Sequence, residues 1–213
     1  MEIKTFYFNP LRTCCYVAWD GTGECVIIDP ACYGGREFSR LDDFVKQQGL
    51  TPVMILLTHG HFDHTFGLEN AFRRWNVPVM LNQADSELMI SSGLWCRELG
   101  LEFNPFKGKT TPLEDGQTLT FGETALEVLA TPGHTPGGVC FLCREAGVIF
   151  TGDTLFAGSI GRTDHEGGDY VQLMESIAHK IMPLDGDISV LPGHGPASTV
   201  GYERATNPFI QGI

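Results

Sequence analysis

The chain has 213 residues, which is enough for one large domain or two small ones with a substantial buried core. Its 42% hydrophobic and 19% charged residues are typical of a globular protein. The 14 basic and 26 acidic residues give a net charge of −12, and no basic stripe is visible. This charge argues against nucleic-acid processing, because binding to a phosphate backbone normally uses clustered lysines and arginines.

The first residues lead directly into a strand-like pattern, without the charged segment and long apolar run of a signal peptide. No apolar run approaches the roughly 20 residues of a membrane span. Seven cysteines, an odd number, then favour reduced thiols and a cytoplasmic location. Cys140 and Cys143 lie in a strand-like run, where positions three apart face opposite sides, so we expect core cysteines and no redox or zinc pair.

In chain order, the first half is expected to contain strands at 3–8, 13–19 and 24–28, a helix at 36–48 ending at Gly49, a strand at 53–57, a helix at 68–75, a strand at 77–81 and a short helix at 84–91. Residues 93–118, with several prolines and glycines, are expected to be the least regular part.

The second half is expected to contain hairpins at 119–130 and 138–151, an amphipathic helix at 170–181 and a last strand at 188–191. No linker or repeat divides the chain, so residues 1–213 are expected to form a single domain. Two strand-rich halves with helices predict an α/β protein in which two sheets pack face to face, with helices outside.

The stretch Thr58 to His64, T-H-G-H-F-D-H, is the strongest chemical signal in the chain. It follows a short apolar run and places four possible metal ligands within six positions: His59, His61, Asp63 and His64. Residues two apart in an extended segment share a face, so His59 and His61 are expected to point the same way. Zinc accepts such nitrogen and oxygen ligands, as do iron and manganese.

Three more possible ligands each follow a strand-like run and lie in a glycine-rich turn: His134 in T-P-G-H-T-P-G, Asp153 in T-G-D-T and His194 in P-G-H-G. Strand ends at one sheet edge can meet in space, and loops there commonly carry chemistry. A metal site at this edge is therefore expected. His165, in a polar loop, and His179, near a helix end, have no matching spacing and are left out of the set.

These motifs, His59-x-His61-x-Asp63-His64 followed by His134, Asp153 and His194, resemble those of the metallo-β-lactamase-fold hydrolases over nearly the whole chain. The resemblance implies a four-layer αββα sandwich of two mixed sheets with a two-metal site at one edge. It implies that His59, His61 and His134 hold the first ion, that Asp63, His64 and His194 hold the second, and that Asp153 bridges both.

Within that superfamily the chain is similar to the short bacterial glyoxalase II-like (hydroxyacylglutathione hydrolase-like) branch. The supporting motifs are T-H-G-H-F-D-H, T-P-G-H-T-P-G, G-D-T-L-F and P-G-H-G. Only the segment 195–213 follows the last ligand, so the C-terminal helical domain that helps hold glutathione in the long form is expected to be missing. The segment 158–164 is similar to those short proteins and also to persulfide dioxygenases. The resemblance argues against antibiotic hydrolysis, because the lactamases typically have a Cys among the second-metal ligands and a secretion signal.

The chemistry also follows from the donors. We expect two zinc ions, with iron or manganese as alternatives. Their positive charge would exceed the negative charge of Asp63 and Asp153, which leaves an electrophilic site. We assign the catalytic role to these two aspartates. Coordination lowers the pKa of water from about 15.7 toward about 7 and provides a hydroxide nucleophile. A thioester suits such a site, because a thiolate with a pKa near about 8.5 can leave without a dedicated acid. The expected reaction is hydrolysis of an S-acyl-glutathione such as S-lactoylglutathione.

Arg162 could pair with a glutathione carboxylate or with Asp164, and Phe156 and Phe66 could line the pocket or pack in the core. Asp29 could support a ligand histidine or form a turn. Thr58 is expected to support the motif turn.

Two other functions remain open. A persulfide dioxygenase would use one iron held by His59, His134 and Asp153. A non-catalytic metal protein is less favoured, because structural zinc sites are usually closed four-coordinate ones.

Overall fold

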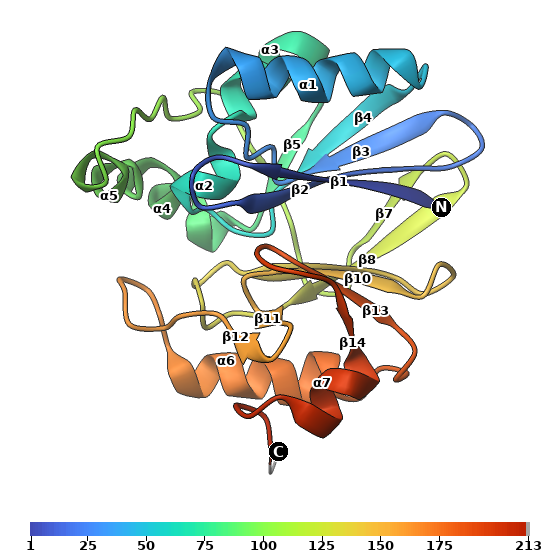
Figure 1. The fold of residues 1–213 in the computed structure, drawn as a ribbon, viewed down its shortest axis with the longest axis vertical. Coiled ribbons are helices and arrows are strands. Elements are labelled where there is room, and N and C mark those ends of the chain that lie inside the picture. The colour runs from blue at the N-terminus through green and yellow to red at the C-terminus, as the bar shows by residue number, and fades with distance from the viewer. Residues whose placement is uncertain (212–213) are drawn as a thin grey trace.

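The structure is a computed structural model that describes residues 1–211, and it contains two six-stranded mixed β-sheets packed face to face (Figure 1). The first sheet has its strands in sequence order: β1 (Glu2–Phe8), β2 (Thr13–Trp19), β3 (Glu24–Ile28), β4 (Thr51–Leu56), β5 (Val79–Leu81) and β6 (Thr111–Pro112). Its first three strands are antiparallel, and β3 through β6 run parallel to one another.

The second sheet is formed by the C-terminal half in the order β14-β13-β10-β9-β8-β7. Its strands are β7 (Thr118–Phe121), β8 (Thr124–Ala130), β9 (Val139–Cys143), β10 (Val148–Gly152), β13 (Ser189–Pro192) and β14 (Ser198–Thr199). The pair β10–β13 is parallel and the other pairs are antiparallel. A two-stranded ribbon, β11 (Leu155–Phe156) with β12 (Ser159–Ile160), follows β10.

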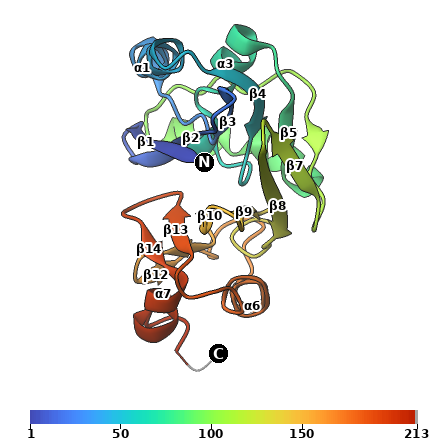
Figure 2. The same ribbon diagram turned by 90° about the vertical axis from the view of Figure 1, so that its right-hand side faces the viewer.

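Helices cover the outer face of each sheet, as Figures 1 and 2 show, so the molecule has four layers. Over the first sheet lie α1 (Gly34–Gln47) and α3 (Leu68–Trp75); under the second lie α6 (Tyr170–Ser176), which continues into a π-helical turn (Ile177–Ile181), and α7 (Val200–Thr206). Three shorter helices gather at one edge: α2 (Phe62–Thr65), α4 (Ser86–Ser91), preceded by a 3₁₀ turn (Gln83–Asp85), and α5 (Gly93–Glu98). This is the αββα arrangement that the sequence predicted.

The strand β2 shows why the central strands are continuous apolar runs in the sequence. Alternate residues point to opposite faces of a strand. Cys15 and Val17 pack with α1 and α3 in the outer core, whereas Cys14, Tyr16 and Ala18 face the other sheet. Because both faces of β2 are covered, every residue from Thr13 to Ala18 is buried and no polar alternation remains.

Most expected strands and long helices are confirmed, with ends displaced by one or two residues. Residues 93–118 are the least regular long stretch, as expected, although they contain the short elements α5 and β6. Elements of two to seven residues were missed, namely α2, α7, β11, β12 and β14. Such short pieces carry too few residues for periodicity to show, and their order comes from the surrounding packing. Among the described residues, no helix has both the length and the apolar character needed to cross a membrane.

Candidate metal centre

The T-H-G-H-F-D-H motif begins where β4 ends and turns directly into α2. His61 is the N-cap of α2, and Asp63 and His64 follow within its single turn. The turn is held from below by Asp29, whose carboxylate accepts hydrogen bonds from the backbone N–H of Thr58 (2.8 Å) and from its hydroxyl (2.6 Å). Thr58 therefore supports the motif turn, as expected.

Loops of the second sheet bring the other three candidate ligands to the same place. His134 follows β8, Asp153 follows β10 and His194 follows β13. The Nε2 atom of His134 lies 3.5 Å from Asp153 Oδ2, and His194 Nε2 lies 3.2 Å from Asp63 Oδ2. All seven side chains that the sequence singled out thus meet between the two sheets.

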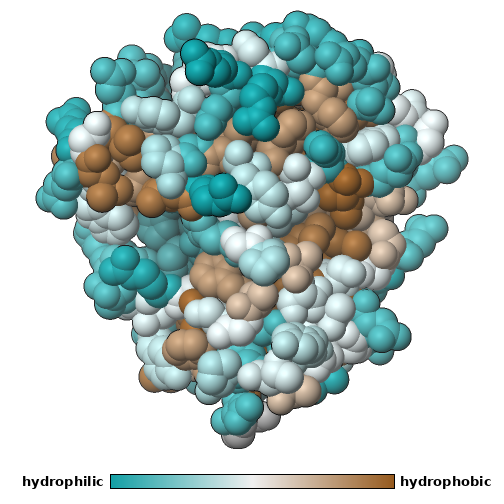
Figure 3. Space-filling model, viewed as in Figure 1, coloured by the Kyte–Doolittle hydropathy of each residue, from teal (hydrophilic) through white to brown (hydrophobic). Residues whose placement is uncertain are grey.

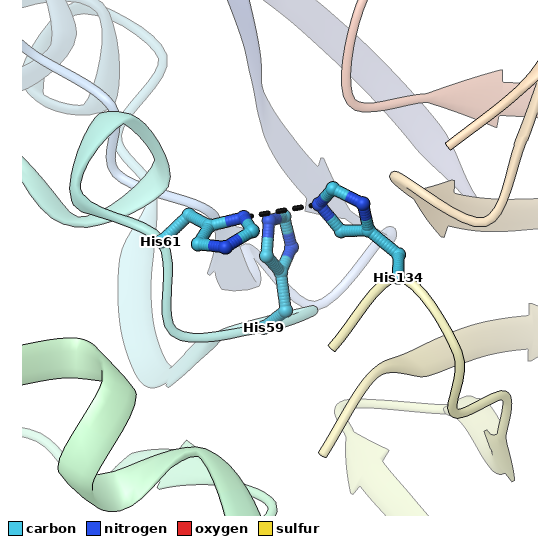
Figure 4. A group of neighbouring side chains, drawn as sticks. All are labelled: His59, His61 and His134. Atoms are coloured by element: carbon cyan, nitrogen blue, oxygen red, sulfur yellow. Dashed lines mark hydrogen bonds between the residues drawn. The ribbon is translucent and has the colours of Figure 1, made fainter. Parts of the chain in front are cut away.

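Their donor atoms form three overlapping groups in which all atoms lie within 4.8 Å of one another: His59, His61 and His134; His59, His64 and Asp153; and Asp63, His64 and His194. Figure 4 shows the first group, with His134 approaching from the C-terminal half of the chain. Its His61 Nδ1 and His134 Nε2 lie 3.0 Å apart. Two nitrogens on one tetrahedral zinc would be roughly 3.3 Å apart, given Zn–N bonds of about 2.05 Å.

Unpaired buried atoms give an independent test of whether a metal fits. Within residues 1–211, four buried side-chain atoms have no hydrogen-bond partner: Nε2 of His59, of His61 and of His64, and Oδ1 of Asp153. Buried polar atoms are normally paired, because leaving one unsatisfied costs about 1–3 kcal/mol. Four unsatisfied donors and acceptors in one cluster are the pattern expected of metal ligands, so the residues fit a metal centre.

Polar contacts around the candidate ligands fix their orientation. Asp29 Oδ2 lies 2.8 Å from His64 Nδ1, so this carboxylate supports a candidate ligand as well as the turn. Asp63 accepts a hydrogen bond from the Thr13 hydroxyl (2.8 Å), and the Asn9 amide donates to its backbone carbonyl (2.9 Å). The contact with Asp29 leaves Nε2 of His64 free for a metal, and the Thr13 and Asn9 contacts hold Asp63 with its Oδ2 toward His194.

Close packing at the centre explains one glycine of the P-G-H-G motif. A Cβ atom at Gly193 would lie 2.1 Å from Asp153 Oδ1 and 2.7 Å from His64 Cε1. Any side chain there would displace two candidate ligands, so the position requires glycine.

The electrostatic environment differs between the two ends of the cluster. Burial and the neighbouring imidazoles lower the pKa of His59, and burial lowers the pKa of His61 to about 3. At His64, burial acts in the same direction, but the carboxylates of Asp63, Asp153 and Asp29 outweigh it and raise the pKa. Burial opposes ionisation of Asp63, yet His64 and His194 lower its pKa to about 2. The imidazoles of His59 and His61 are therefore neutral and the Asp63 carboxylate is ionised, the forms that bind metal. At His64 the carboxylates favour the protonated ring, so a bound cation would replace that proton.

An open cavity of about 720 Å³ lies over the cluster. Besides His61, Asp63, His134, Asp153 and His194, it is lined by Leu11, Phe62, Trp95, Glu98, Leu99, Phe156, Arg162 and His165. Figure 3 shows an apolar patch on this side of the molecule, with the surface hollowed beneath it. Among the residues that line the cavity, Leu99 is an exposed apolar side chain.

The expected substrate-contact residues have different positions. Phe156 and Arg162 line the cavity, and Arg162 also forms a bidentate ion pair with Asp164 (2.9 and 3.0 Å). Phe66 lies on the other side of α2, where it packs edge-on against Phe62 and Tyr33 and lines a separate cavity. His179 lies in the π-helical turn after α6.

Sequence reasoning missed three residues around the centre. His165 lies with its Nε2 3.4 Å from His134 Nδ1, and its ring is edge-on to His61 and His134. Trp95 of α5 lies 5.5 Å from the ring of His61 and 5.6 Å from that of His165. Asp85 contacts both ligand-bearing loops. Only His165 had a sequence signal, since it follows the Gly158–Asp164 segment closely. Trp95 lies in the irregular stretch 93–118 and Asp85 in the expected helix 84–91, and neither has a ligand motif around it.

Comparisons with known proteins agree with this fold and this arrangement. A family model described as the Metallo-beta-lactamase superfamily matches residues 9–203. A probable metallo-hydrolase, YqgX of Bacillus subtilis, is 38% identical over 192 residues, covering 89% of each chain. Hydroxyacylglutathione hydrolase GloC of Haemophilus influenzae is 35% identical over 212 residues, covering 99% of this chain and 98% of that one.

Two solved structures share the fold over nearly the whole chain. BLEG-1, described as a B3 metallo-beta-lactamase, has a TM-score of 0.87 at 35% identity and covers 99% of this chain and 100% of its own. TTHA1623 in a di-iron-bound form has a TM-score of 0.87 at 37% identity, with coverage of 97% and 99%.

The chain therefore belongs to the metallo-β-lactamase superfamily. Within it, the similarities include metallo-hydrolases, and the His and Asp cluster contains three groups of side chains that could hold a metal ion. Because TTHA1623 was solved in a di-iron-bound form, iron stands beside zinc and manganese as a candidate metal for the present chain.

Proposed function

We propose that this chain is a binuclear metal-dependent thioesterase that cleaves S-acyl-glutathione, with S-lactoylglutathione as the model substrate. The observation that carries the proposal is the convergence of seven ligand-type side chains, four of which present a buried atom without a partner. The 35% identity to a hydroxyacylglutathione hydrolase over 99% of the chain supports the substrate class.

In the proposed centre, His59, His61 and His134 would hold one ion and Asp63, His64 and His194 would hold the other, with Asp153 as a ligand that both would share. When bound, two divalent ions supply a water acidic enough to ionise near neutral pH and a Lewis acid for the carbonyl oxygen. Asp63 and Asp153 supply the negative charge that keeps two cations in a buried site. Asp29 and Thr13 hold His64 and Asp63 in place.

The cavity supports a thioester with an extended thiol arm. Trp95, Leu99 and Leu11 offer apolar surface beside the metal cluster, and Arg162 is a cation at the same cavity. A carboxylate of glutathione could compete with Asp164 for the Arg162 guanidinium, which binds carboxylates bidentately. The thiolate needs no dedicated acid to leave. The proposed hydrolysis therefore requires no general acid beyond the buried residues that are assigned as metal ligands.

The test measures the metal content of the purified protein together with hydrolysis of S-lactoylglutathione. We expect two zinc-like ions per chain, and loss of turnover by at least about 100-fold in Asp153→Ala, because this change would remove the ligand that both ions are proposed to share. A β-lactam is the comparison substrate, given the likeness to BLEG-1. Thioesterase turnover that survives in Asp153→Ala, or that continues in excess chelator, would refute the mechanism.

A second candidate is an iron-dependent persulfide dioxygenase, which the di-iron form of TTHA1623 keeps in consideration. It would use His59, His134 and Asp153 around a single iron, a two-histidine, one-carboxylate set. One iron per chain with oxygen uptake on a glutathione persulfide would favour it over hydrolysis. A metal-loaded protein that turns over neither substrate would instead indicate a non-catalytic metal-binding protein.

We also infer a cytoplasmic location. All seven cysteines are free and buried, which agrees with a reducing compartment. No nucleic-acid or membrane partner is proposed.

A further inference from the structure

Asp85 is a fully buried carboxylate that contacts both halves of the candidate metal centre. It ends the 3₁₀ turn between β5 and α4, 21 positions after His64 in the chain, where the sequence shows no ligand motif. An ionisable side chain with 0% exposure needs a compensating set of partners, because burial of an unpaired charge costs several kcal/mol.

The partners come from two loops that belong to different sheets. Asp85 Oδ2 accepts hydrogen bonds from the backbone N–H of Gly60 (2.8 Å) and from the Thr135 hydroxyl (2.7 Å). Asp85 Oδ1 accepts one from the backbone N–H of Gly137 (2.6 Å). Gly60 lies between His59 and His61, and Thr135 follows His134, so one carboxylate joins the backbone segments that carry these three histidines.

Both glycines are in close contact with Asp85. A Cβ atom at Gly60 would lie 2.8 Å from the Asp85 carbonyl oxygen, and one at Gly137 would lie 2.8 Å from the Asp85 carboxyl carbon. The glycines of T-H-G-H and T-P-G therefore make room for this carboxylate as well as forming turns.

All three partners are donors, so the ionised carboxylate is the form that fits. Burial raises the pKa of Asp85, and the hydrogen bonds from Thr135, Gly60 and Gly137 oppose that effect. Hydrogen bonds to a charged group are about twice as strong as those between neutral groups. An amide at this position would place an N–H group against at least one of the donors.

We propose that Asp85 is a positioning residue that fixes the His59–His61 turn against the His134 loop, so that these three imidazoles are arranged before a metal binds. The role in metal binding rests on the proposed centre, whereas the role in ordering the two loops does not. Supporting partners of this kind typically change metal affinity by 10- to 100-fold.

The test compares Asp85→Asn with a matched control, Asp42→Asn. Asp42 is also buried, and it forms ion pairs with Lys46 of α1 and Arg74 of α3. It lies in α1, which covers the outer face of the first sheet. Amide hydrogen exchange of Gly60 and Gly137, measured with chelator present, is expected to rise at least about tenfold in Asp85→Asn and to stay unchanged in Asp42→Asn. Zinc competition with a chromophoric chelator is expected to show one ion weakened about 10- to 100-fold and the other within about threefold.

The proposal would be overturned if amide hydrogen exchange of Gly60 and Gly137 were unchanged in Asp85→Asn. It would also be overturned if Asp85→Asn and Asp42→Asn both weakened the binding of the two zinc ions equally. If the wild-type protein binds no zinc or iron, the proposed function fails, and the exchange measurement still decides the role of Asp85. If Asp85→Asn does not fold, Thr135→Val removes one donor and retains the carboxylate. It is expected to give a smaller increase in Gly60 exchange and the same selective loss of one ion, and no change in either would refute the proposal.

Discussion

Asp29 shows how one side chain can serve a turn and a ligand together. Its backbone has a φ of 49°, in the left-handed region, and its carboxylate contacts Thr58 and His64. The sequence suggested either a turn former or a partner for a ligand histidine, and the structure shows that it is both. Aspartate tolerates this backbone conformation better than most residues do, and it also provides two acceptors.

We expect Asp29→Asn to weaken metal binding without loss of the fold. Asparagine also tolerates the left-handed region, so the backbone should be retained, while the neutral amide supports the His64 ring less strongly. Metal affinity measured by chelator competition should fall about 10- to 100-fold. Asp187→Asn, at an exposed position, serves as the control and should bind metal as the wild type does. Equal affinities in the three proteins would contradict the supporting role of Asp29.

At the scale of elements, α5 is the one that sequence reasoning did not find and that bears most directly on substrate. It follows α4 after a single residue, Ser92, and presents Trp95 to the cavity while Leu94 points outward with 62% exposure. A helix of six residues is too short to be recognised from periodicity, and it depends on its neighbours for stability.

Trp95→Ala is expected to raise KM for S-lactoylglutathione about 5- to 30-fold and to change kcat less than about threefold. The physical reason is that the indole contributes apolar contact area to bound substrate and does not hold metal, so about 1–2 kcal/mol of uniform binding is lost. Steady-state kinetics together with metal analysis measures both effects. Leu94→Ala, on the outer side of the same helix, should leave KM unchanged; a matching rise in KM there would show that the effect comes from the helix and not from the indole.

At the scale of the whole molecule, the layer between the sheets joins the two halves of the chain. Phe150 of β10 is 1% exposed and its ring meets that of Tyr16 of β2 at 5.1 Å, edge-on. The Tyr16 hydroxyl donates to the Pro192 carbonyl at 2.6 Å, just before the Gly193–His194 turn. The same packing that joins the sheets therefore also places His194 relative to the motif of the first half.

The single-domain prediction can be tested through this layer. All three tryptophans, Trp19, Trp75 and Trp95, lie in the first half of the chain, whereas Phe150 lies in the second. If the chain unfolds as one unit, Phe150→Ala should lower the free energy of unfolding by about 3–5 kcal/mol, and tryptophan fluorescence and far-UV circular dichroism should shift together in urea. Val171→Ala, at a position 65% exposed, is the control with little expected change. A fluorescence midpoint that stays at the wild-type value would indicate two independently unfolding units.

Much of the fold and of the candidate centre could be predicted because the signals were local. An apolar run followed by a glycine turn and a histidine or aspartate marks a strand end, and four such runs meet at one edge. The short elements could not be predicted, because α2 and α7 derive their stability from contacts that span the chain.

The sequence by itself determined the ligand-type residues, the long strands and helices and, through its motifs, the superfamily. Each of these depends on residue identity and on spacing over a few positions. Only the tertiary structure decided that Asp85, Trp95 and His165 surround the cluster and that Phe66 faces another cavity. Asp85 bonds Gly60 and Thr135 across 25 and 50 positions of chain, and no local pattern encodes such a contact. The physical reason is that hydrogen bonds between loops form only after packing of the two sheets has brought those loops together.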